Sequence, residues 1–362
     1  MIAVISVTLF FLVLRFSVTV FNFISNPKLT RVSRLYTDKV SILIPARNEL
    51  DNIIPLLESI QQQKYQNYEV IIYDDNSSDD TYTLCSAFVA THPRFTVIKG
   101  GEPPDGWLGK SYACSQLARH ATGQYFLFLD ANVRLTDDFI NSAVHRMHIY
   151  TLGLLSLFPN QVMHTIGEKT TVPLLHYMLL NLLPLRLIYL VKNDLIAIAS
   201  GQCMLFDAAI YRQNLWHSKV KNKVLAETQI MKQVKAAGHN GEVLLANGML
   251  DSRMYWGYTD AITGFSKNLL PAFNYGIPAL FIYILLLAAG PMVILMTLNL
   301  NLIFFMVGLI MLTRVMTSLS AGQNAGENLV LHPLQMINLV IIAFLSVQKH
   351  LTGNLIWKGR GI

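Results

Sequence analysis

The sequence has few cysteines, and their spacing excludes two kinds of site. Only three occur in 362 residues, namely Cys85, Cys114 and Cys203, and no two of them form a CxxC pair. This spacing argues against a disulfide framework and against a zinc site built from thiolates. We therefore expect three buried free thiols, which fits the reducing environment of the cytosol.

Several catalytic motifs and long basic runs are also absent. The ten histidines form no HExxH pattern, no GxSxG turn is present, and GWLGKS (106–111) lacks the GxxxxGK[ST] spacing of a Walker A loop. A zinc peptidase and an α/β-hydrolase are therefore disfavoured. The net charge of +6 suits anionic partners such as lipid headgroups or a diphosphate, but without basic runs the sequence does not predict nucleic-acid binding.

Charged residues are scarce, and the apolar residues that replace them are clustered. Hydrophobic residues make up 52% of the chain, charged residues 14%, and the mean hydropathy is +0.40, values unusual for a soluble protein. The first 25 residues predict an uncleaved anchor, and three spans are predicted near 276–296, 301–316 and 329–347. Residues 172–191 contain two prolines and predict an interfacial or re-entrant helical pair beside an acceptor entrance.

The distribution of basic residues predicts how the chain crosses the membrane. Arg15 interrupts the first apolar run and either snorkels or faces protein. Four basic residues follow that run: Lys28, Arg31, Arg34 and Lys39. By the positive-inside rule the following domain is cytoplasmic, in a multi-pass protein of the cell membrane. Four spans would put the C-terminus outside, whereas Lys349, Lys358 and Arg360 favour a cytoplasmic tail. A break at His332-Pro333 would reconcile the two, and the sequence leaves this open.

The middle of the chain alternates between short apolar runs and helix-like segments. Strands are predicted at 40–46, 68–75, 95–100 and 125–130, with helices between them. This alternation predicts an α/β fold with a mostly parallel, doubly wound sheet. The predicted domains are an anchor with its basic flank at 1–35, an α/β domain at 36–270 that includes the interface helices near 172–191, and C-terminal transmembrane helices at 271–362.

The order of several motifs resembles a known family. SILIPARNE (41–49) is followed by VIIYDDNSSDDT (70–81) and by DAN (130–132) after YFLFL, as in the GT-A nucleotide-sugar domain of family 2 glycosyltransferases. Four further segments resemble membrane-bound bacterial members that glycosylate lipids, such as carotenoid-acid (4,4'-diaponeurosporenoate) and hopanoid-associated glycosyltransferases. They are GWLGKSYA (106–113), SGQCMLF (200–206), LAETQ (225–229) and IWKGR (356–360).

The resemblance implies a donor site at the carboxyl ends of the strands, the edge where open α/β sheets bind ligands. Asp75 would accept the imide N–H of uracil and Asp74 would shape its loop. Pro45, Arg47 and Glu49 would border the nucleotide. Two plainer interpretations stay open: DDNSSDDT also suits a turn or helix cap, and Arg47 also suits a solvated surface charge.

The resemblance also implies a divalent metal ion, Mg²⁺ or Mn²⁺. Asp130 and Asn132 occupy the positions of the family's metal-binding DxD motif. Such an ion takes oxygen ligands and would neutralise charge on the leaving diphosphate. Because Asn132 replaces an acid, we expect weaker binding of the ion, and DAN also suits a plain strand-end turn.

Three more residues complete the predicted site. Lys110, just ahead of a helix predicted to begin near Ser111, would contact a phosphate oxygen, and Arg253 in DSRMYWGY (251–258) would clamp the diphosphate. Glu227 is the candidate general base, although Thr228 replaces the second acid of the family's Glu-Asp pair. A first-turn glutamate that favours the helix dipole is the alternative interpretation.

These assignments predict an inverting glycosyltransferase. Its donor would be a UDP-sugar, with UDP-glucose as the first choice, and its acceptor a lipid-like terpenoid or carotenoid reached from the membrane. Two alternatives are transfer to polyprenyl phosphate and a catalytically impaired protein that binds sugar nucleotides. A transporter is disfavoured because it would leave the nucleotide-type domain unexplained.

Overall fold

The computed structural model describes residues 2–136, 138–353, 356–357 and 360–361, and it divides the chain into two compact units. We call Pro27–Asn160 with Arg186–Ser252 the sheet unit. We call Met1–Asn26 with Gln161–Leu185 and Arg253–Ile362 the helical unit. The chain therefore passes between the two units several times, and the domain boundaries expected from sequence stay predictions.

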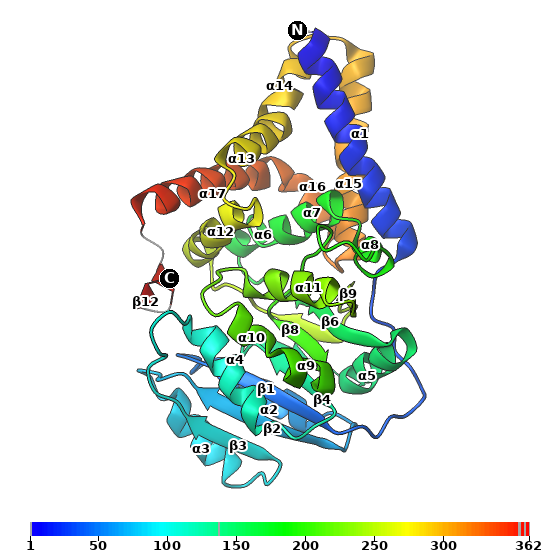
Figure 1. The fold of residues 1–362 in the computed structure, drawn as a ribbon. Coiled ribbons are helices and arrows are strands. Elements are labelled where there is room, and N and C mark those ends of the chain that lie inside the picture. Colours follow the sequence, from blue (N-terminus) through cyan, green and yellow to red (C-terminus); the bar gives the residue numbers. More distant parts are fainter. Residues whose placement is uncertain (1, 137, 354–355, 358–359, 362) are drawn as a thin grey trace. The chain divides into compact units, whose positions relative to one another are not determined.

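The sheet unit is built on a seven-stranded mixed sheet of order β3-β2-β1-β4-β8-β6-β9 (Figure 1). Its strands are β1 (Val40–Ala46), β2 (Tyr68–Asp74), β3 (Phe95–Lys99), β4 (Tyr125–Leu129), β6 (Leu152–Phe158), β8 (Cys203–Asp207) and β9 (Asn240–Leu245). Neighbours are parallel except that β8 runs antiparallel to both β4 and β6. The predicted mostly parallel α/β sheet is confirmed, and the four predicted strands are found within one residue of their expected ends.

Helices cover both faces of this sheet because its strands are buried on both sides. Apolar residues of β1 such as Val40 and Ile42 share one core with α2 and α5, whereas α4 packs on β1 and β2 outside that core. In Figure 1, α4 and α9 to α11 lie in front of the sheet. The helices are α2 (Ile53–Gln61), α3 (Thr81–Val89), α4 (Gly109–His120), α5 (Phe139–Tyr150), α9 (Ala208–Asn214), α10 (Trp216–Lys219) and α11 (Ala226–Ala236).

Short strands form two smaller sheets. A small sheet of order β5-β10-β7 joins β5 (Val133–Leu135), β10 (Leu250–Ser252) and β7 (Asn160–Gln161). Near the C-terminus, β11 (Ile356–Trp357) pairs antiparallel with β12 (Arg360–Gly361). The pairing of β5 with β10 is antiparallel and follows directly on the carboxyl end of β4, so it helps to fix the loop that carries Asp130.

Among its described residues, the helical unit contains four helices that are long and apolar enough to cross a membrane. They are Ile2–Ser25 (α1), Ile277–Leu295 (α13, η1 and α14 in succession), Leu300–Ser320 (α15) and His332–Thr352 (α17). The predicted anchor and the three predicted C-terminal spans are thus found as helices. The shorter helices of this unit are α6 (Ile166–Lys169), α7 (Pro173–Leu182), α12 (Tyr258–Ala272) and α16 (Ala325–Val330), and the chain leaves it through α8 (Leu185–Leu190).

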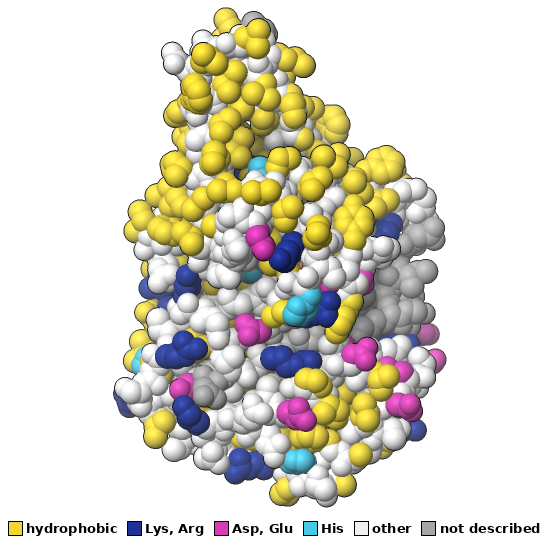
Figure 2. Space-filling view, turned by 180° about the vertical axis from the view of Figure 1, so that it is seen from behind, with side chains coloured by type: hydrophobic (Ala, Val, Ile, Leu, Met, Phe, Trp, Pro, Cys, Tyr) yellow, Lys and Arg dark blue, Asp and Glu magenta, His cyan; other side chains and the backbone are white. Residues whose placement is uncertain are grey.

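The outer surface of these long helices is apolar. Figure 2 shows hydrophobic side chains covering the part of the molecule that holds α1 and α13 to α15 in Figure 1. Phe10, Phe281 and Phe304 are 69%, 64% and 71% exposed. A continuous apolar surface of this kind is found where a protein meets lipid or another protein.

The helices of this unit approach each other closely. Gly290 at the start of α14 lies against α1, where a Cβ atom would fall 2.6 Å from Thr8 Cγ2. A glycine is therefore required at this contact, as at many helix contacts in membranes. Arg15 of α1 is only 3% exposed, so its side chain faces protein, and the snorkelling alternative is wrong.

The predicted pair of helices within 172–191 is present as α7 and α8, which are separated by Leu183 and Pro184. The side chain of Asn22 satisfies the backbone at this break. Its Nδ2 donates to the carbonyl oxygens of Leu180 and Leu183 at 2.8 Å each, and its Oδ1 accepts from the Leu185 N–H at 2.9 Å. One buried amide thus replaces the helical hydrogen bonds that Pro184 interrupts.

Candidate functional site

Polar loops follow β1, β2 and β4 at the carboxyl edge of the sheet. Asn48 and Asn76 have positive φ angles of 51° and 52°, a conformation that asparagine tolerates better than most residues. The antiparallel direction of β8 brings the segment 200–202, which precedes it, to the same edge. The backbone N–H of Asp130 donates to the Gln202 carbonyl at 3.1 Å, which ties the two loops together.

Arg47 joins the loops after β1 and β2. Its Nη1 donates to the carbonyl oxygens of Asp75 and Asn76 at 2.7 and 3.0 Å, and the Asp75 N–H donates to Ala46 O at 2.7 Å. Arg47 is partly exposed and also holds the two loops together, and its role toward a nucleotide stays a prediction. Asp75 is 3% exposed and is held at the sheet edge by these bonds.

The neighbouring residues shape these two loops. One carboxylate oxygen of Asp74 accepts from the Ser77 N–H at 3.3 Å, while the buried Oδ1 has no hydrogen-bond partner among the described residues. The Glu49 N–H donates to Thr81 Oγ1 and its carboxylate accepts from Asn52 Nδ2, each at 2.9 Å. Pro45 lies in β1 opposite Tyr73 of β2. Their roles toward a nucleotide stay predictions.

Lys110 lies close to two acids of the candidate site, the metal-ligand candidate Asp130 and the candidate base Glu227. It lies in the first turn of α4, where its Nζ is 2.5 Å from Asp130 Oδ1 and 3.2 Å from the Gly201 carbonyl oxygen. A Cβ at Gly201 would lie 3.3 Å from Lys110 Nζ and 3.2 Å from Glu227 Cδ, so glycine makes room for both side chains. Although burial lowers the pKa of Lys110, the charges of Asp130 and Glu227 raise it above its usual value. The ammonium group therefore stays charged between two acids.

The loop after β4 would hold a divalent ion only together with further oxygen ligands from a bound nucleotide sugar. Asp130 offers a carboxylate, and the buried Oδ1 of Asn132 has no hydrogen-bond partner in the described chain. No group of three or more His, Cys, Asp or Glu side chains that could hold an ion exists among the described residues. Asp130 and Asn132 would thus supply two oxygen ligands, and diphosphate oxygens and water the rest. The ion would neutralise charge on the leaving diphosphate.

Glu227 lies in the first turn of α11, as predicted, and points to the same edge as Lys110. Thr228, which stands where the family has a second acid, accepts a hydrogen bond from the Ala199 N–H at 3.4 Å. Thr228 thus contacts the backbone just before the 200–202 segment. Glu227 is left as the one carboxylate of the LAETQ motif that can serve as a base.

Arg253 belongs to the helical unit and is engaged there. Its Nη2 donates to Glu168 Oε1 at 2.8 Å, and its guanidinium carbon lies 3.7 Å from the centroid of the Trp256 ring. Glu168 is fully buried and also accepts from the N–H groups of His164 and Gly257 at 2.7 and 2.9 Å. Although burial raises it, these partners lower the pKa of Glu168 to about 2. The clamp role of Arg253 stays a prediction.

The family match concerns a segment that carries most of the candidate site. Residues 41–215 match the family model described as "Glycosyl transferase family 2". This segment is a family 2 glycosyltransferase domain. The predicted resemblance is thereby confirmed.

Two curated relatives of this chain are named 4,4'-diaponeurosporenoate glycosyltransferase. The protein of Staphylococcus haemolyticus (strain JCSC1435) is 32% identical over 130 residues, which are 35% of this chain and 34% of that protein. The protein of Staphylococcus aureus (strain USA300) is 36% identical over 126 residues, which are 34% and 32% of the two chains. The matched part thus spans about a third of the length of these relatives.

A solved structure extends the likeness to the whole chain. The mannosyltransferase PcManGT from Pyrobaculum calidifontis, in complex with GDP-Man and Mn²⁺, covers 96% of this chain and 99% of its own with a TM-score of 0.53. Because the identity is 18%, this likeness concerns the fold alone. The predicted GT-A fold is confirmed.

Within the sheet unit the structure brings together most of the predicted site. Asp74, Asp75, Asp130 and Asn132 lie at the carboxyl ends of β2 and β4, with Pro45, Arg47 and Glu49 beside them, and Lys110 and Glu227 reach the same edge from the first turns of α4 and α11. Sequence reasoning missed Gly201, whose lack of a side chain lets Lys110 and Glu227 approach. It also missed Glu168, although Thr165-x-x-Glu168 has the pattern of a capping box. Lys358 of the IWKGR motif lies outside the described residues.

Proposed function

We propose that this protein is an inverting glycosyltransferase that moves a hexose from a nucleotide diphosphate sugar to an apolar acceptor taken from a membrane. One observation supports the proposal above all. Asp75, Lys110, Asp130 and Glu227 gather at the carboxyl edge of the sheet that carries the family 2 match, and the described part of the chain has four helices that could cross a membrane. UDP-glucose is the proposed donor, and a terpenoid or carotenoid is the proposed acceptor.

The donor would lie across the carboxyl edge of the sheet. Asp75 would accept a hydrogen bond from the imide N–H of uracil. Its position supports this role, because Asp75 is buried just after β2 and its backbone is held by Arg47. The ammonium group of Lys110 would exchange part of its contact with Asp130 for an oxygen of the diphosphate. A Mg²⁺ or Mn²⁺ ion held by Asp130 and Asn132 would supply further positive charge there.

Glu227 would act on the acceptor. Its carboxylate takes the proton of an acceptor hydroxyl, and the hydroxyl oxygen attacks the anomeric carbon from the face opposite the diphosphate. The bond between the anomeric carbon and the diphosphate oxygen breaks, and the nucleoside diphosphate leaves with the electron pair. The configuration at the anomeric carbon inverts.

The chemistry of the acceptor decides how much this base matters. A hydroxyl group holds its proton at neutral pH, whereas a carboxylic acid, whose ordinary pKa is about 4–5, is already ionised. The staphylococcal relatives are named for a carotenoid acid. Transfer to such an acid would give a glycosyl ester and would need no general base, so Glu227 distinguishes the two acceptor classes.

We also propose that the domain lies on the cytoplasmic side. Four basic residues, Lys28, Arg31, Arg34 and Lys39, follow α1 closely, as expected for a cytoplasmic flank. In Figure 1, α17 runs across the direction of α1 and α15. It is also the least apolar of the four long helices, with a hydropathy of 1.4 against 2.0 to 2.4. If α17 lies along the membrane surface, three spans remain and the C-terminus is cytoplasmic. This is the side that the basic residue Lys349 favours.

The test uses membranes that contain the full chain. They would be supplied with radiolabelled UDP-glucose, other UDP-sugars or GDP-mannose, together with lipid extracts, and membranes with Asp130→Asn serve as control. We expect release of UDP and a labelled apolar product in the wild type alone. A charged, acid-labile product would point to polyprenyl phosphate as acceptor. Donor binding without any transfer would contradict the proposal and favour a binding protein, which Asn132 and Thr228 make the second candidate.

A further inference from the structure

Two arginines are completely enclosed among the long apolar helices. Arg15 of α1 is 3% exposed and Arg314 of α15 is 0% exposed. Their guanidinium carbons lie 4.9 and 4.8 Å from the centroid of the same ring, that of Tyr177 on α7. Both residues belong to the helical unit, so two positive charges are buried around one aromatic side chain.

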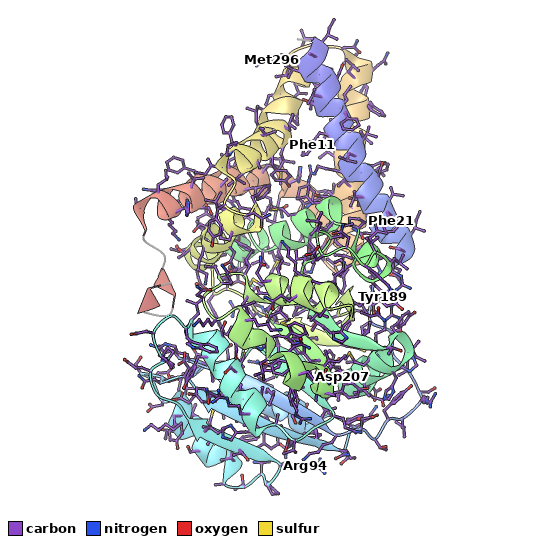
Figure 3. All side chains as sticks on the ribbon, in the orientation of Figure 1. Phe11, Phe21, Arg94, Tyr189, Asp207 and Met296 are labelled. Carbon is purple, nitrogen blue, oxygen red and sulfur yellow. The ribbon has the colours of Figure 1, made fainter. Side chains whose placement is uncertain are left out.

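Neither charge is balanced by an acid in the described part of the chain. Arg15 donates from Nε to the amide oxygen of Asn181 at 3.2 Å and contacts the rings of Phe11 and Tyr283. Figure 3 labels Phe11 on α1, which packs edge-on against Tyr283 of α13. Amides and rings attract a cation, but they leave its full charge in place.

Arg314 has the same kind of surroundings. Its Nη2 donates to the amide oxygens of Asn328, at 3.1 Å, and of Gln335, and its Nε lies 3.4 Å from the Asn328 carbonyl oxygen. These partners connect α15 with α16 and α17, so Arg314 also serves to hold helices together. A neutral residue that donates hydrogen bonds could do that without the cost of burying a charge.

Unused donors surround Tyr177. The described structure gives no hydrogen-bond partner to several buried polar atoms, which are Arg15 Nη2, Asn181 Nδ2, Tyr283 Oη, Arg314 Nη1, Thr317 Oγ1 and His332 Nδ1. The His332 ring lies 5.5 Å from that of Tyr177. Most of these atoms are donors, and no carboxylate is among them. A site that combines two cations with free donors lacks an anion that accepts hydrogen bonds.

We propose that Arg15 and Arg314 form the binding site for the acidic group, a carboxylate or a phosphate, of a membrane amphiphile with an apolar tail. The oxyanion neutralises the two guanidinium groups and accepts from their free N–H groups. We infer the apolar tail of the ligand from the surroundings of the two arginines. The neighbouring residues are apolar, and the outer faces of α1, α13 and α15 are exposed and hydrophobic. The site is independent of glycosyl transfer and stands whether or not the proposed function is correct.

The test measures binding to the purified full chain in an uncharged detergent. Four probes are compared: palmitate, hexadecyl phosphate, hexadecanol and inorganic phosphate. Thermal unfolding is followed by tryptophan fluorescence, and native mass spectrometry counts bound molecules. We expect palmitate and hexadecyl phosphate to bind once per chain and to raise the Tm, while hexadecanol and inorganic phosphate leave it unchanged. Equal effects of palmitate and hexadecanol, or of inorganic phosphate and hexadecyl phosphate, would overturn the proposal.

Variants assign the binding to the two arginines. Charge-assisted hydrogen bonds of this kind contribute enough that Arg15→Gln and Arg314→Gln should each weaken palmitate binding about tenfold or more. Lys349→Gln, which removes a partly exposed cation from α17 of the same unit, is the matched control and should bind palmitate as the wild type does. Wild-type affinity in the Arg15→Gln/Arg314→Gln double variant would refute the assignment.

The design also covers the case in which the variants do not fold. Arg15→Lys and Arg314→Lys keep the charge and should retain most of the preference for palmitate over hexadecanol. Because the comparison of the acid with the alcohol needs no substitution, it decides the question in the wild type alone. Substitutions that lower the Tm equally with and without palmitate would show that the two arginines only hold helices together.

Discussion

Three cations of the sheet unit contact acids, whereas Arg15 and Arg314 among the long helices contact none in the described chain. In the sheet unit, Arg146 donates from Nε and Nη2 to the buried Glu242 at 2.6 Å each, and Arg186 adds a third bond at 3.2 Å. Lys110 likewise lies against Asp130. Arg15 and Arg314 have amides and rings instead. The difference sets Arg15 and Arg314 apart from the cations that have acids, including Arg253 of their own unit, and the proposed anion site accounts for it.

The largest expected effect concerns Glu227, the candidate general base. Glu227→Gln should lower kcat about 10²–10⁴-fold with a hydroxyl acceptor, because the variant cannot take the proton. With a carboxylic acid acceptor the fall should be less than about tenfold, since that acceptor is already ionised. Product formation with both acceptor types is measured at saturating UDP-glucose.

The control for this variant is Glu58→Gln, which removes an exposed carboxylate from α2 of the same unit. It should retain wild-type turnover with either acceptor. If Glu227→Gln lowers the Tm strongly and both turnover rates equally, Glu227 serves mainly as a counter-ion of Lys110, and the base has to be sought elsewhere.

The second prediction removes a counter-ion from the sheet unit. Glu242→Gln leaves Arg146 and Arg186 without their acid, and breaking a buried pair of this kind costs about 3–5 kcal/mol. We expect a Tm decrease of about 5–15 °C for a chain of this size, measured by fluorescence-detected unfolding. An unchanged Tm would mean that Arg146 and Arg186 do not depend on their acid, and the contrast with Arg15 and Arg314 would fail.

The third prediction asks whether the Arg253–Glu168 pair makes part of the helical unit pH-sensitive. The pKa of Glu168 is about 2, below its ordinary value of 4.5, so its contribution to stability is complete above pH 4.5 and is lost as the pH falls toward 2. Between pH 5 and pH 3 the Tm of the wild type should therefore fall more than that of Glu168→Gln. Parallel pH profiles for the two proteins would disprove the lowered pKa.

The smallest expected effect tests the metal ligands. Asn132→Asp restores a second carboxylate next to Asp130 and should lower the Mn²⁺ concentration for half-maximal activity by about tenfold, because a full charge binds a hard cation more tightly than an amide does. A titration of transfer activity with MnCl₂ measures it. No change would indicate that Lys110 already supplies the positive charge and that this edge of the sheet needs no ion.

The sequence was sufficient to predict the first half of the sheet. β1, β2 and β4 are apolar runs of five to seven residues that end in polar loops, and that pattern places Asp75 and Asp130 at one edge. The half built from β6, β8 and β9 was not predicted. A run such as Leu152–Phe158, buried throughout, has no alternation that separates a strand from a buried helix.

Contacts between distant residues were the part that sequence could not supply. Nothing near Arg253 in the chain points to Glu168, since the pair is separated by 85 residues. Arg314 was passed over because a single cation hardly changes the hydropathy of a long apolar run. The approach of Lys110 to Glu227 across Gly201 depends on the antiparallel direction of β8, which local patterns do not determine.

The hydrogen bonds of Asn22 also bear on how this protein can be produced. Its side chain serves two carbonyl groups and one N–H group at the α7–α8 break, which the ribosome makes about 160 residues later. A shortened protein without α1 would leave these three backbone groups bare in apolar surroundings, at about 1–3 kcal/mol each. Shortened versions for crystallisation therefore need to keep α1. If α1 is removed, the stretch around Pro184 has to be redesigned as well.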